Sequence, residues 1–157
     1  MKVGRITCSD RASAGVYEDK GGPEIERVFS GIWPEAVEFV ARIIPDEVGE
    51  IEAALRHLAD VDGCPLIITT GGTGFAKRDV TPEATLAVIE KELPGFGEMM
   101  RSISFAVAPT SILSRATAGV RGRSLIVNLP GNPKAIGQCL PPLLPAIREA
   151  LRHLEEV

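Results

Sequence analysis

Short apolar runs alternate with amphipathic segments in the first half of this chain. The apolar runs Val3–Cys8, Val37–Ile44 and Cys64–Thr69 predict buried strands. Between them, apolar residues recur at helical spacing over Pro23–Trp33 and Val48–Val61 and predict two amphipathic helices. Strands that alternate with helices in this way are typical of an α/β fold with a mostly parallel sheet, covered by helices on both faces.

The second half of the chain predicts a more varied set of elements. Thr81-Pro82-Glu83 is typical of a helix start, with Thr81 as a hydroxyl N-cap and an acid near the positive end of the helix dipole. We expect that helix to run to about Leu93. The other elements expected here are a helix over Phe96–Val107, a short helical turn over Pro109–Arg115, strands over Ala116–Val120 and Ser124–Leu129, and a last helix that begins at Lys134 and is interrupted at Pro141–Pro145.

Four loops follow strands of the predicted sheet and hold most of the candidate chemistry. They are Ser9-Asp10-Arg11, Pro45-Asp46-Glu47, Gly71–Asp79 and Pro130–Lys134. In a parallel sheet, ligands bind beyond the carboxyl ends of the strands. We therefore expect these four loops to open on one edge of the sheet and to form a single site.

Length, charge and cysteine usage set broad limits on function. The 157 residues suit a single domain over residues 1–157. A net charge of −4 argues against holding nucleic acid by bulk electrostatics, and no apolar run reaches the roughly 20 residues of a membrane span. Three widely spaced cysteines and an N-terminus without a signal-peptide profile fit a reducing compartment. We expect a cytoplasmic protein with no nucleic-acid or membrane partner.

The segment Thr70-Gly71-Gly72-Thr73-Gly74 is the strongest single indication of a ligand. Glycine allows positive φ and close approach of the backbone to a ligand, and successive backbone N–H groups can converge on phosphate. The segment is not a P-loop, because Gly74 is followed by Phe75-Ala76-Lys77 instead of Gly-Lys-Ser/Thr. The alternative reading is an ordinary tight turn between a strand and a helix.

Asp46 and Asp79 are the candidate catalytic and metal-binding carboxylates. Each lies just beyond a predicted strand end, so both can face the same crevice. A carboxylate beside phosphate is repulsive unless a cation lies between them, and Mg²⁺ is commonly held by one or two carboxylates plus substrate phosphates. Two acids around a phosphate-binding loop predict metal-assisted phosphoryl or nucleotidyl transfer. The alternatives are a turn residue for Asp46 and a helix-entry cap for Asp79.

Other polar groups near these loops carry weaker signals. The basic residues are Arg11, Lys77, Arg78, Arg115 and Lys134, and each is also readable as a solvated surface charge. Asn128, Pro130, Gly131 and Pro133 shape a loop that can meet a flat heterocycle or serve as a plain turn. His57 and His153 have no partners at metal-ligand spacing and lie away from strand ends, which argues against a zinc site and a Ser-His-Asp hydrolase.

In order along the chain, several motifs match one known family. They are Ser9–Gly15 with Asp19-Lys20-Gly21; Ile44–Glu47; Thr69–Gly74 with Arg78–Thr85; Pro94–Arg101; Ile112–Arg115; and Leu129–Lys134. With these motifs the chain resembles the MogA-type molybdopterin adenylyltransferases, a family also seen as the G domain of gephyrin-like proteins. The match spans nearly the whole chain, and its specificity comes from the set rather than from any one motif.

The resemblance implies a three-layer αβα fold, usually a trimer, with Mg²⁺ and ATP. It implies transfer of AMP from ATP to the terminal phosphate of molybdopterin, with release of pyrophosphate, before hand-over to a molybdenum-inserting protein. By the same resemblance, Asp46 and Asp79 are the essential acids. Substrate- or nucleotide-binding roles are expected for Ser9, Asp10, Arg11, Thr70, Gly71, Gly72, Thr73, Gly74, Arg78, Glu83, Ser114, Asn128, Pro130, Gly131, Pro133 and Lys134.

Three rival functions stay open from the sequence. The first is a paralogue that binds molybdopterin without transferring anything. The second is a molybdenum-inserting domain, which is normally part of a longer chain. The third is a nucleotide-binding scaffold within a larger assembly. Pyrophosphate release from ATP separates the adenylyltransferase from the non-catalytic binder.

Overall fold

The computed structural model describes all residues from Met1 to Val157 and contains one six-stranded sheet. The strand order is β2-β1-β3-β6-β5-β4. Strands β1 (Lys2–Cys8), β2 (Glu38–Ile44), β3 (Leu66–Thr70) and β6 (Ser124–Leu129) are parallel. Strand β5 (Ala118–Arg121) pairs antiparallel to β6, and β4 (Lys91–Glu92) pairs antiparallel to β5 at the edge of the sheet. The predicted mostly parallel sheet is confirmed.

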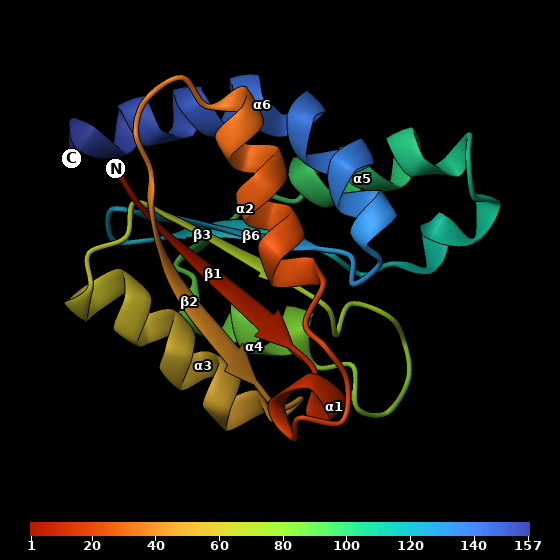
Figure 1. Ribbon diagram of the computed structural model, residues 1–157. Coiled ribbons are helices and arrows are strands. Elements are labelled where there is room, and N and C mark those ends of the chain that lie inside the picture. The colour runs from red at the N-terminus through yellow and green to blue at the C-terminus, as the bar shows by residue number, and fades with distance from the viewer.

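Helices cover both faces of the sheet and make three layers (Figure 1). One face carries α2 (Gly21–Ile32), α5 (Gly95–Phe105) and α6 (Pro133–Glu155). The other carries α3 (Val48–Arg56), its π-helical extension η1 (His57–Val61) and α4 (Thr81–Val88). The short α1 (Asp10–Ser13) lies at the end of β1, and the 3₁₀ turn η2 (Pro109–Leu113) follows α5.

Two apolar cores hold these layers together. Val3, Ile68 and Val127 project to the α2–α6 side, whereas Ile6, Ile67 and Ile126 project to the α3–α4 side. Adjacent strand residues face opposite sides of the sheet, so a continuous apolar run supplies both cores. Burial of each such side chain stabilises the fold by about 1.5–3 kcal/mol. The strand interiors are thereby rigid, and their carboxyl ends are fixed platforms for loops.

The order of strands creates a crevice between β1 and β3. From β1 the chain crosses by way of α2 to β2 on one side, and from β2 it crosses by way of α3 to β3 on the other side of β1. Helices α2 and α3 therefore pack on opposite faces of the sheet, as Figure 1 shows. In open α/β sheets, ligands bind at such a switch point, beyond the carboxyl ends of the strands.

Three local predictions need correction. Helix α4 ends at Val88 instead of Leu93, because Ile89 is extended and the backbone of residues 90–93 bonds to β5. Thr81 is the first helical residue and not the N-cap, because its hydroxyl donates to the carbonyl oxygen of Gly71 at 2.9 Å. The helix at the C-terminus is not interrupted.

Helix α6 runs without a break through Pro141, Pro142 and Pro145. Proline inside a helix removes a backbone hydrogen bond and normally bends or ends the helix. Here the apolar face that includes Leu140, Leu143 and Ile147 is packed into the larger core, and this burial outweighs the missing bonds. None of the helices combines the length and apolar character needed to cross a bilayer.

Candidate functional site

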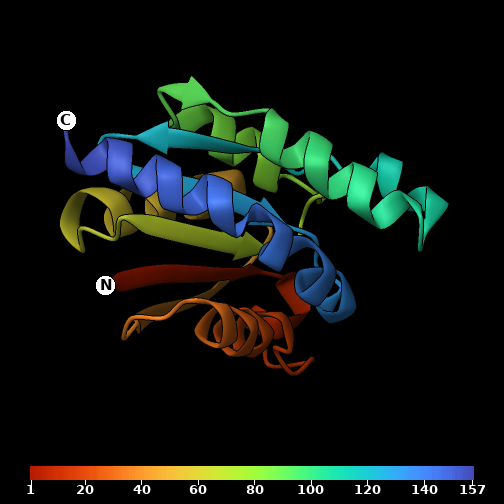
Figure 2. The ribbon, with the colours of Figure 1, turned by 90° about the horizontal axis from the view of Figure 1, so that it is seen from above.

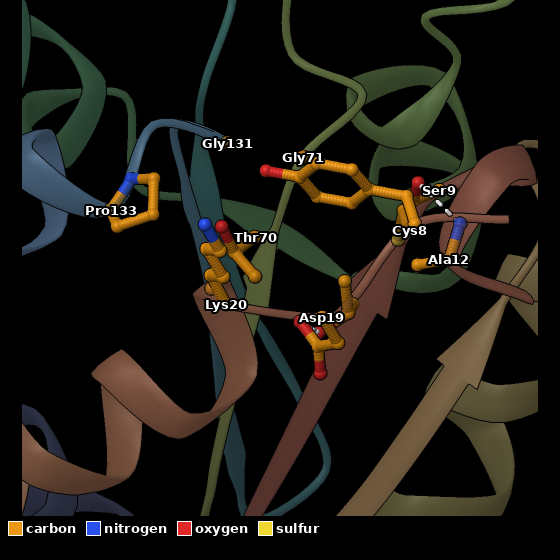
Figure 3. Close-up of a pocket in the computed structure, with 12 residues that line it drawn as sticks. Cys8, Ser9, Ala12, Asp19, Lys20, Thr70, Gly71, Gly131 and Pro133 are labelled. Carbon is orange, nitrogen blue, oxygen red and sulfur yellow. Dashed lines mark hydrogen bonds between the residues drawn. The ribbon is translucent and has the colours of Figure 1, made fainter. Parts of the chain in front are cut away.

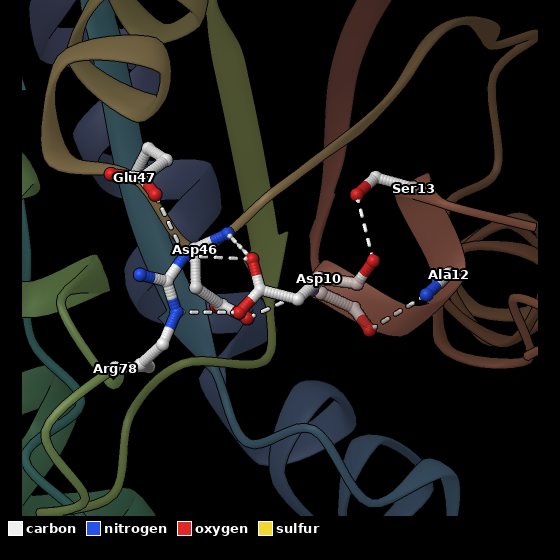
Figure 4. A network of polar contacts seen from close by, with 7 residues as sticks. Asp10, Ala12, Ser13, Asp46, Glu47 and Arg78 are labelled. Carbon is white, nitrogen blue, oxygen red and sulfur yellow. Dashed lines mark hydrogen bonds and ion pairs between the residues drawn. The ribbon is translucent and has the colours of Figure 1, made fainter. Parts of the chain in front are cut away.

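Asp10 and Asp46 join the ends of β1 and β2 through a reciprocal pair of hydrogen bonds (Figure 4). The backbone N–H of Asp10 donates to Oδ2 of Asp46, and the backbone N–H of Asp46 donates to Oδ1 of Asp10, both at 3.0 Å. Their position follows from the register that pairs Cys8 with Ile44. The other oxygen of Asp46, Oδ1, is buried and has no hydrogen-bond partner. Because buried polar atoms almost always have a hydrogen-bond partner, this oxygen is a candidate point of contact for a ligand or a cation.

The pKa values of Asp46 and Asp10 are shifted in opposite directions. Burial raises the pKa of Asp46, and the charges of Asp10 and Asp79 raise it further, although the backbone N–H of Asp10 opposes them. The hydrogen bond from Arg78 holds the pKa of Asp10 below its ordinary value. Asp46 lies next to Gly72 and Asp79 next to Gly74, so the two predicted acids adjoin the same loop. A cation bound beside Asp46 would stabilise its ionised form and lower its pKa.

The glycine loop passes directly over Asp46. Gly71 and Gly72 have φ of +93° and +67°, values that favour glycine. A side chain at Gly71 would collide with the carbonyl oxygen of Cys8. At Gly72 a Cβ would collide with the hydroxyl of Thr81 and lie 3.1 Å from Oδ1 of Asp46. The loop is therefore built to bring bare backbone close to the unpartnered carboxylate oxygen.

Asp79 lies at the far end of the same loop, in a closed turn. The N–H of Ala76 donates to Oδ2 of Asp79, and the N–H of Asp79 donates to the carbonyl oxygen of Ala76, both at 3.0 Å. Oδ2 of Asp79 also lies next to Gly74, where a Cβ would be only 2.7 Å away. The predicted convergence of Asp46, Asp79 and the glycine loop is thus what the structure shows. No group of three or more His, Cys, Asp or Glu side chains is arranged to hold a metal ion alone.

Arg115 holds the loop through contacts with its backbone and with Glu83. Its Nε donates to the carbonyl oxygen of Gly74 at 2.7 Å, its Nη2 donates to that of Asp79 at 2.8 Å, and its Nη1 pairs with Glu83. Its backbone N–H also donates to the carbonyl oxygen of Thr73 at 2.8 Å. Glu83, a predicted binding residue, is occupied by this arginine. In the sequence Arg115 is one of several basic residues near the loops and the last residue of the Ile112–Arg115 motif, and neither feature predicts this clamp.

Asn128 is fully buried beneath the loop instead of facing a pocket. Its amide nitrogen donates to the hydroxyls of Thr69 at 3.1 Å and Thr85 at 2.9 Å, and its oxygen accepts from the N–H of Thr117 at 3.4 Å. It therefore joins β6, β3, α4 and the start of β5 below the site. In this arrangement Asn128 acts on a ligand only through the segments that it holds.

Two hollows adjoin opposite ends of the glycine loop. The first, of about 160 Å³, lies at the switch point between β1 and β3 (Figure 3). Its lining includes Ser9, Tyr17, Lys20, Thr70, Gly131 and Pro133. The second, of about 390 Å³, lies between the loop and η2, and its lining includes Thr73, Gly74, Phe75, Asp79, Leu113 and Ser114. A loop with a cavity at each end can bring two ligands together across itself.

The remaining predicted residues lie around the first hollow. The carbonyl oxygen of Pro130 accepts from the hydroxyl of Thr70 at 2.8 Å, which ties the two loops together. Lys134 is exposed in the first turn of α6, and Arg11 is exposed with its guanidinium 5.4 Å from the ring centroid of Tyr17. Tyr17 carries no signal in the sequence, and Lys20 stands out there only as part of the Asp19-Lys20-Gly21 motif.

Asp19 shapes the wall of the first hollow. Its carboxylate accepts from Arg5 at 3.1 Å, and from the hydroxyl of Thr7 and the N–H of Gly22 at 3.0 Å each. These bonds fix the turn that presents Lys20 at the mouth of the hollow. In the Asp19-Lys20-Gly21 motif, Asp19 therefore fixes the turn, and the turn places Lys20 at the first hollow.

Comparison with known proteins agrees with this architecture. The family model described as a probable molybdopterin binding domain matches residues 4–149. Molybdopterin adenylyltransferase from Haemophilus influenzae is 53% identical over 140 residues, which cover 89% of this chain and 71% of that protein. The Helicobacter pylori enzyme of the same name is 51% identical over 147 residues, covering 94% and 84%.

A solved structure supports the same relationship. The molybdopterin biosynthesis enzyme MoaB from Thermus thermophilus superposes with a TM-score of 0.89 at 41% identity, covering 99% of this chain and 97% of that one. The three-layer α/β fold expected from the sequence motifs is confirmed by this match and by the sheet itself. The chain belongs to the molybdenum cofactor biosynthesis family whose domains are described as probable molybdopterin-binding domains.

Proposed function

We propose that this chain transfers AMP from ATP to the terminal phosphate of molybdopterin and releases pyrophosphate. The observation that carries the proposal is the unpartnered, buried Oδ1 of Asp46, which lies under the glycine loop in the field of Asp79. Relatives that are 51–53% identical to the chain carry the name molybdopterin adenylyltransferase. The two hollows at the ends of the loop match a reaction with two substrates.

We assign the first hollow to ATP and the second to the pterin. Ser9 and Lys20 offer a hydroxyl and an ammonium donor to a nucleotide at the switch point. The second hollow combines Ser114 with the exposed aromatic ring of Phe75, which suits a flat heterocycle. Asp79 lines the second hollow, and Asp46 lies next to Gly72 in the loop segment where the phosphates would meet.

The residues present fit Mg²⁺, which this function requires. Carboxylate oxygens are the ligands that Mg²⁺ prefers, and the ion is usually held by one or two of them together with substrate phosphates. Asp46 and Asp79 would supply these oxygens, and the absence of a third acidic ligand leaves room for the triphosphate. The bound ion would offset the negative charge of the phosphates during the transfer.

The chain's own groups position the reacting phosphates. An oxygen of the molybdopterin phosphate attacks the α-phosphorus of ATP, the new P–O bond forms, and the bond to the β-phosphate breaks as pyrophosphate leaves. The phosphate nucleophile is already largely ionised near pH 7, so no strong base is needed. Backbone N–H groups of residues 71–74 would hold the phosphate oxygens, and Lys20 would face the anionic nucleotide. Catalysis would then rest on orientation and electrostatic stabilisation.

We further propose a homotrimer that hands its product to a molybdenum-inserting protein. Its support is an exposed apolar surface at the end of α5 and on η2, formed by Phe105, Val107, Ile112 and Leu113. This segment projects beyond the sheet in two views (Figures 1 and 2). The unpaired thiols of all three cysteines support the cytoplasm as the place of the reaction.

The direct test is pyrophosphate release from ATP, Mg²⁺ and molybdopterin. We expect release that requires all three components and stops when molybdopterin is omitted. Binding of molybdopterin without pyrophosphate release would contradict the proposal and favour a non-catalytic binding protein. The pocket assignments are tested separately: Lys20→Gln should raise KM for ATP, and Ser114→Ala should raise KM for molybdopterin. The converse pattern would overturn the assignment of the hollows.

A further inference from the structure

Arg78 makes the only side-chain hydrogen bonds between the turn that contains Asp79 and the ends of β1 and β2. Its Nε donates to Oδ2 of Asp10 at 2.6 Å, and its Nη2 donates to Oδ1 of Asp10 at 3.0 Å. The same Nη2 donates to Oε1 of Glu47 at 2.8 Å. The guanidinium is thus engaged by two carboxylates rather than presented to a phosphate (Figure 4).

Asp10 passes this link on to Asp46. Its carboxylate bonds at once to Arg78 and to the backbone N–H of Asp46, while its own N–H fixes Oδ2 of Asp46. One carboxylate therefore connects the turn that carries Asp79 to the acid on the neighbouring strand end. With Oδ2 of Asp46 held in this way, Oδ1 stays pointed at the loop.

We propose that Asp10 is a positioning residue, and that the ion pairs of Arg78 with Asp10 and Glu47 form a latch that holds Asp79 beside Asp46 before substrates arrive. The inference rests on the proposed function, because that function makes Asp46 and Asp79 the reacting acids. It gives Asp10 and Arg78 a role different from direct contact with the nucleotide.

The side chains of the latch are exposed to solvent, which limits their contribution to global stability. The side chains of Arg78, Asp10 and Glu47 are 55%, 39% and 55% exposed. Ion pairs this exposed contribute little to global stability. They can still decide the local equilibrium of a turn whose other ties are its own hydrogen bonds, Arg115 and the packing of Val80 against the core. The latch should therefore control local opening and leave global unfolding nearly unchanged.

Hydrogen exchange of the ligand-free protein tests the latch without any turnover. We expect amides of residues 74–80 to exchange at least about tenfold faster in Asp10→Asn and in Arg78→Gln than in the wild type. Asparagine keeps an oxygen that can accept from Asp46, so the strand ends stay joined. The double variant should exchange no faster than Arg78→Gln alone, because Arg78→Gln already removes the contacts with both Asp10 and Glu47. Arg27→Gln, which removes a similar exposed pair with Glu24 on α2, is the matched control and should not change exchange at these residues.

Wild-type exchange in both single variants would overturn the latch. This outcome is independent of adenylyl transfer, so failure of the latch and failure of the proposed function are distinguishable.

Steady-state kinetics separate positioning from substrate binding. The latch predicts that each single variant lowers kcat about tenfold and that KM for ATP stays within about twofold. It also predicts that the double variant matches Arg78→Gln, which alone removes every contact of the latch. A raised KM for ATP with unchanged kcat, and effects that multiply in the double variant, would instead show that Asp10 and Arg78 contact the nucleotide. That result would overturn the proposal.

Discussion

Arg115 donates from its Nη2 to the backbone carbonyl oxygen of Asp79 at 2.8 Å. Arg115, the residue after Ser114 of the second hollow, thus holds the backbone of Asp79, which is the acid proposed to act at the reacting phosphates. The same guanidinium bonds to the carbonyl oxygen of Gly74 and pairs with Glu83. A planar fork can reach all three acceptors at once, whereas an ammonium group cannot.

Arg115→Lys should therefore impair transfer while leaving the fold intact. We expect kcat for pyrophosphate release to fall about 10- to 100-fold, because the turn containing Asp79 loses two of its backbone anchors. Arg152→Lys is the control, since Arg152 pairs only with exposed glutamates on α6. An Arg115→Lys variant as active as this control would show that the clamp does not position Asp79.

Replacement of Asn128 should destabilise the protein. Asn128→Ala leaves the buried hydroxyls of Thr69 and Thr85 without their shared donor. We expect urea unfolding to show a loss of about 2–4 kcal/mol. Asn132→Ala is a matched control, because Asn132 is exposed and only caps α6, where the loss should be about 1 kcal/mol. Equal losses for the two variants would contradict the buried role of Asn128.

The thiol of Cys8 should be inert even though it lines the first hollow. Cys8 is only 3% exposed, and burial raises its pKa to about 12. The reactive thiolate is therefore scarce at pH 8. We expect the native protein to react negligibly with a thiol-specific reagent at this pH, and all three cysteines to react in denaturant. Rapid labelling of Cys8 in the native state would show that the hollow is wider or more mobile than the structure indicates.

Stability should depend on pH through the ion pair of Asp60 and Arg121. The hydrogen bond from Arg121 lowers the pKa of Asp60 below its ordinary value of 3.8. A lowered folded-state pKa stabilises the protein above pH 3.8, and this contribution is lost as pH falls through the lower value. Asp60 is 48% exposed, so we expect less than about 1 kcal/mol.

The measurement is urea unfolding of Asp60→Asn and wild type between pH 6 and pH 3. The difference between them should be present at pH 6 and should shrink below pH 3.8. Glu50→Gln, which removes an exposed acid without an ion pair, provides the comparison. A difference that grows as the pH falls would contradict the assigned direction.

The convergence of the loops was predictable because parallel strands place their carboxyl ends on one edge. The apolar runs located β1, β2, β3 and β6 to within about two residues, and the loops at their ends follow from connectivity. The bond between Asp10 and Asp46 was not predictable, since it joins residues 36 positions apart. It depends on the register of β1 against β2, which only the packed sheet fixes.

The failures of sequence reasoning have a common physical cause. Lys91–Glu92 has no strand-like pattern, and only pairing with β5 makes it a strand. The prolines of α6 predict an interruption locally, but burial of the opposite face keeps the helix continuous. Arg115 and Asn128 carry no local signal, because their roles arise from partners on distant elements. In each case a tertiary contact overrides the local preference.

The central claim is that Asp79, placed beside Asp46, is essential for adenylyl transfer but not for folding. Pyrophosphate release by Asp79→Asn in the presence of ATP, Mg²⁺ and molybdopterin tests it most directly. We predict a loss of at least about 10²- to 10³-fold in kcat, with the urea midpoint within error of the wild type. Wild-type turnover by a folded Asp79→Asn variant would contradict the account.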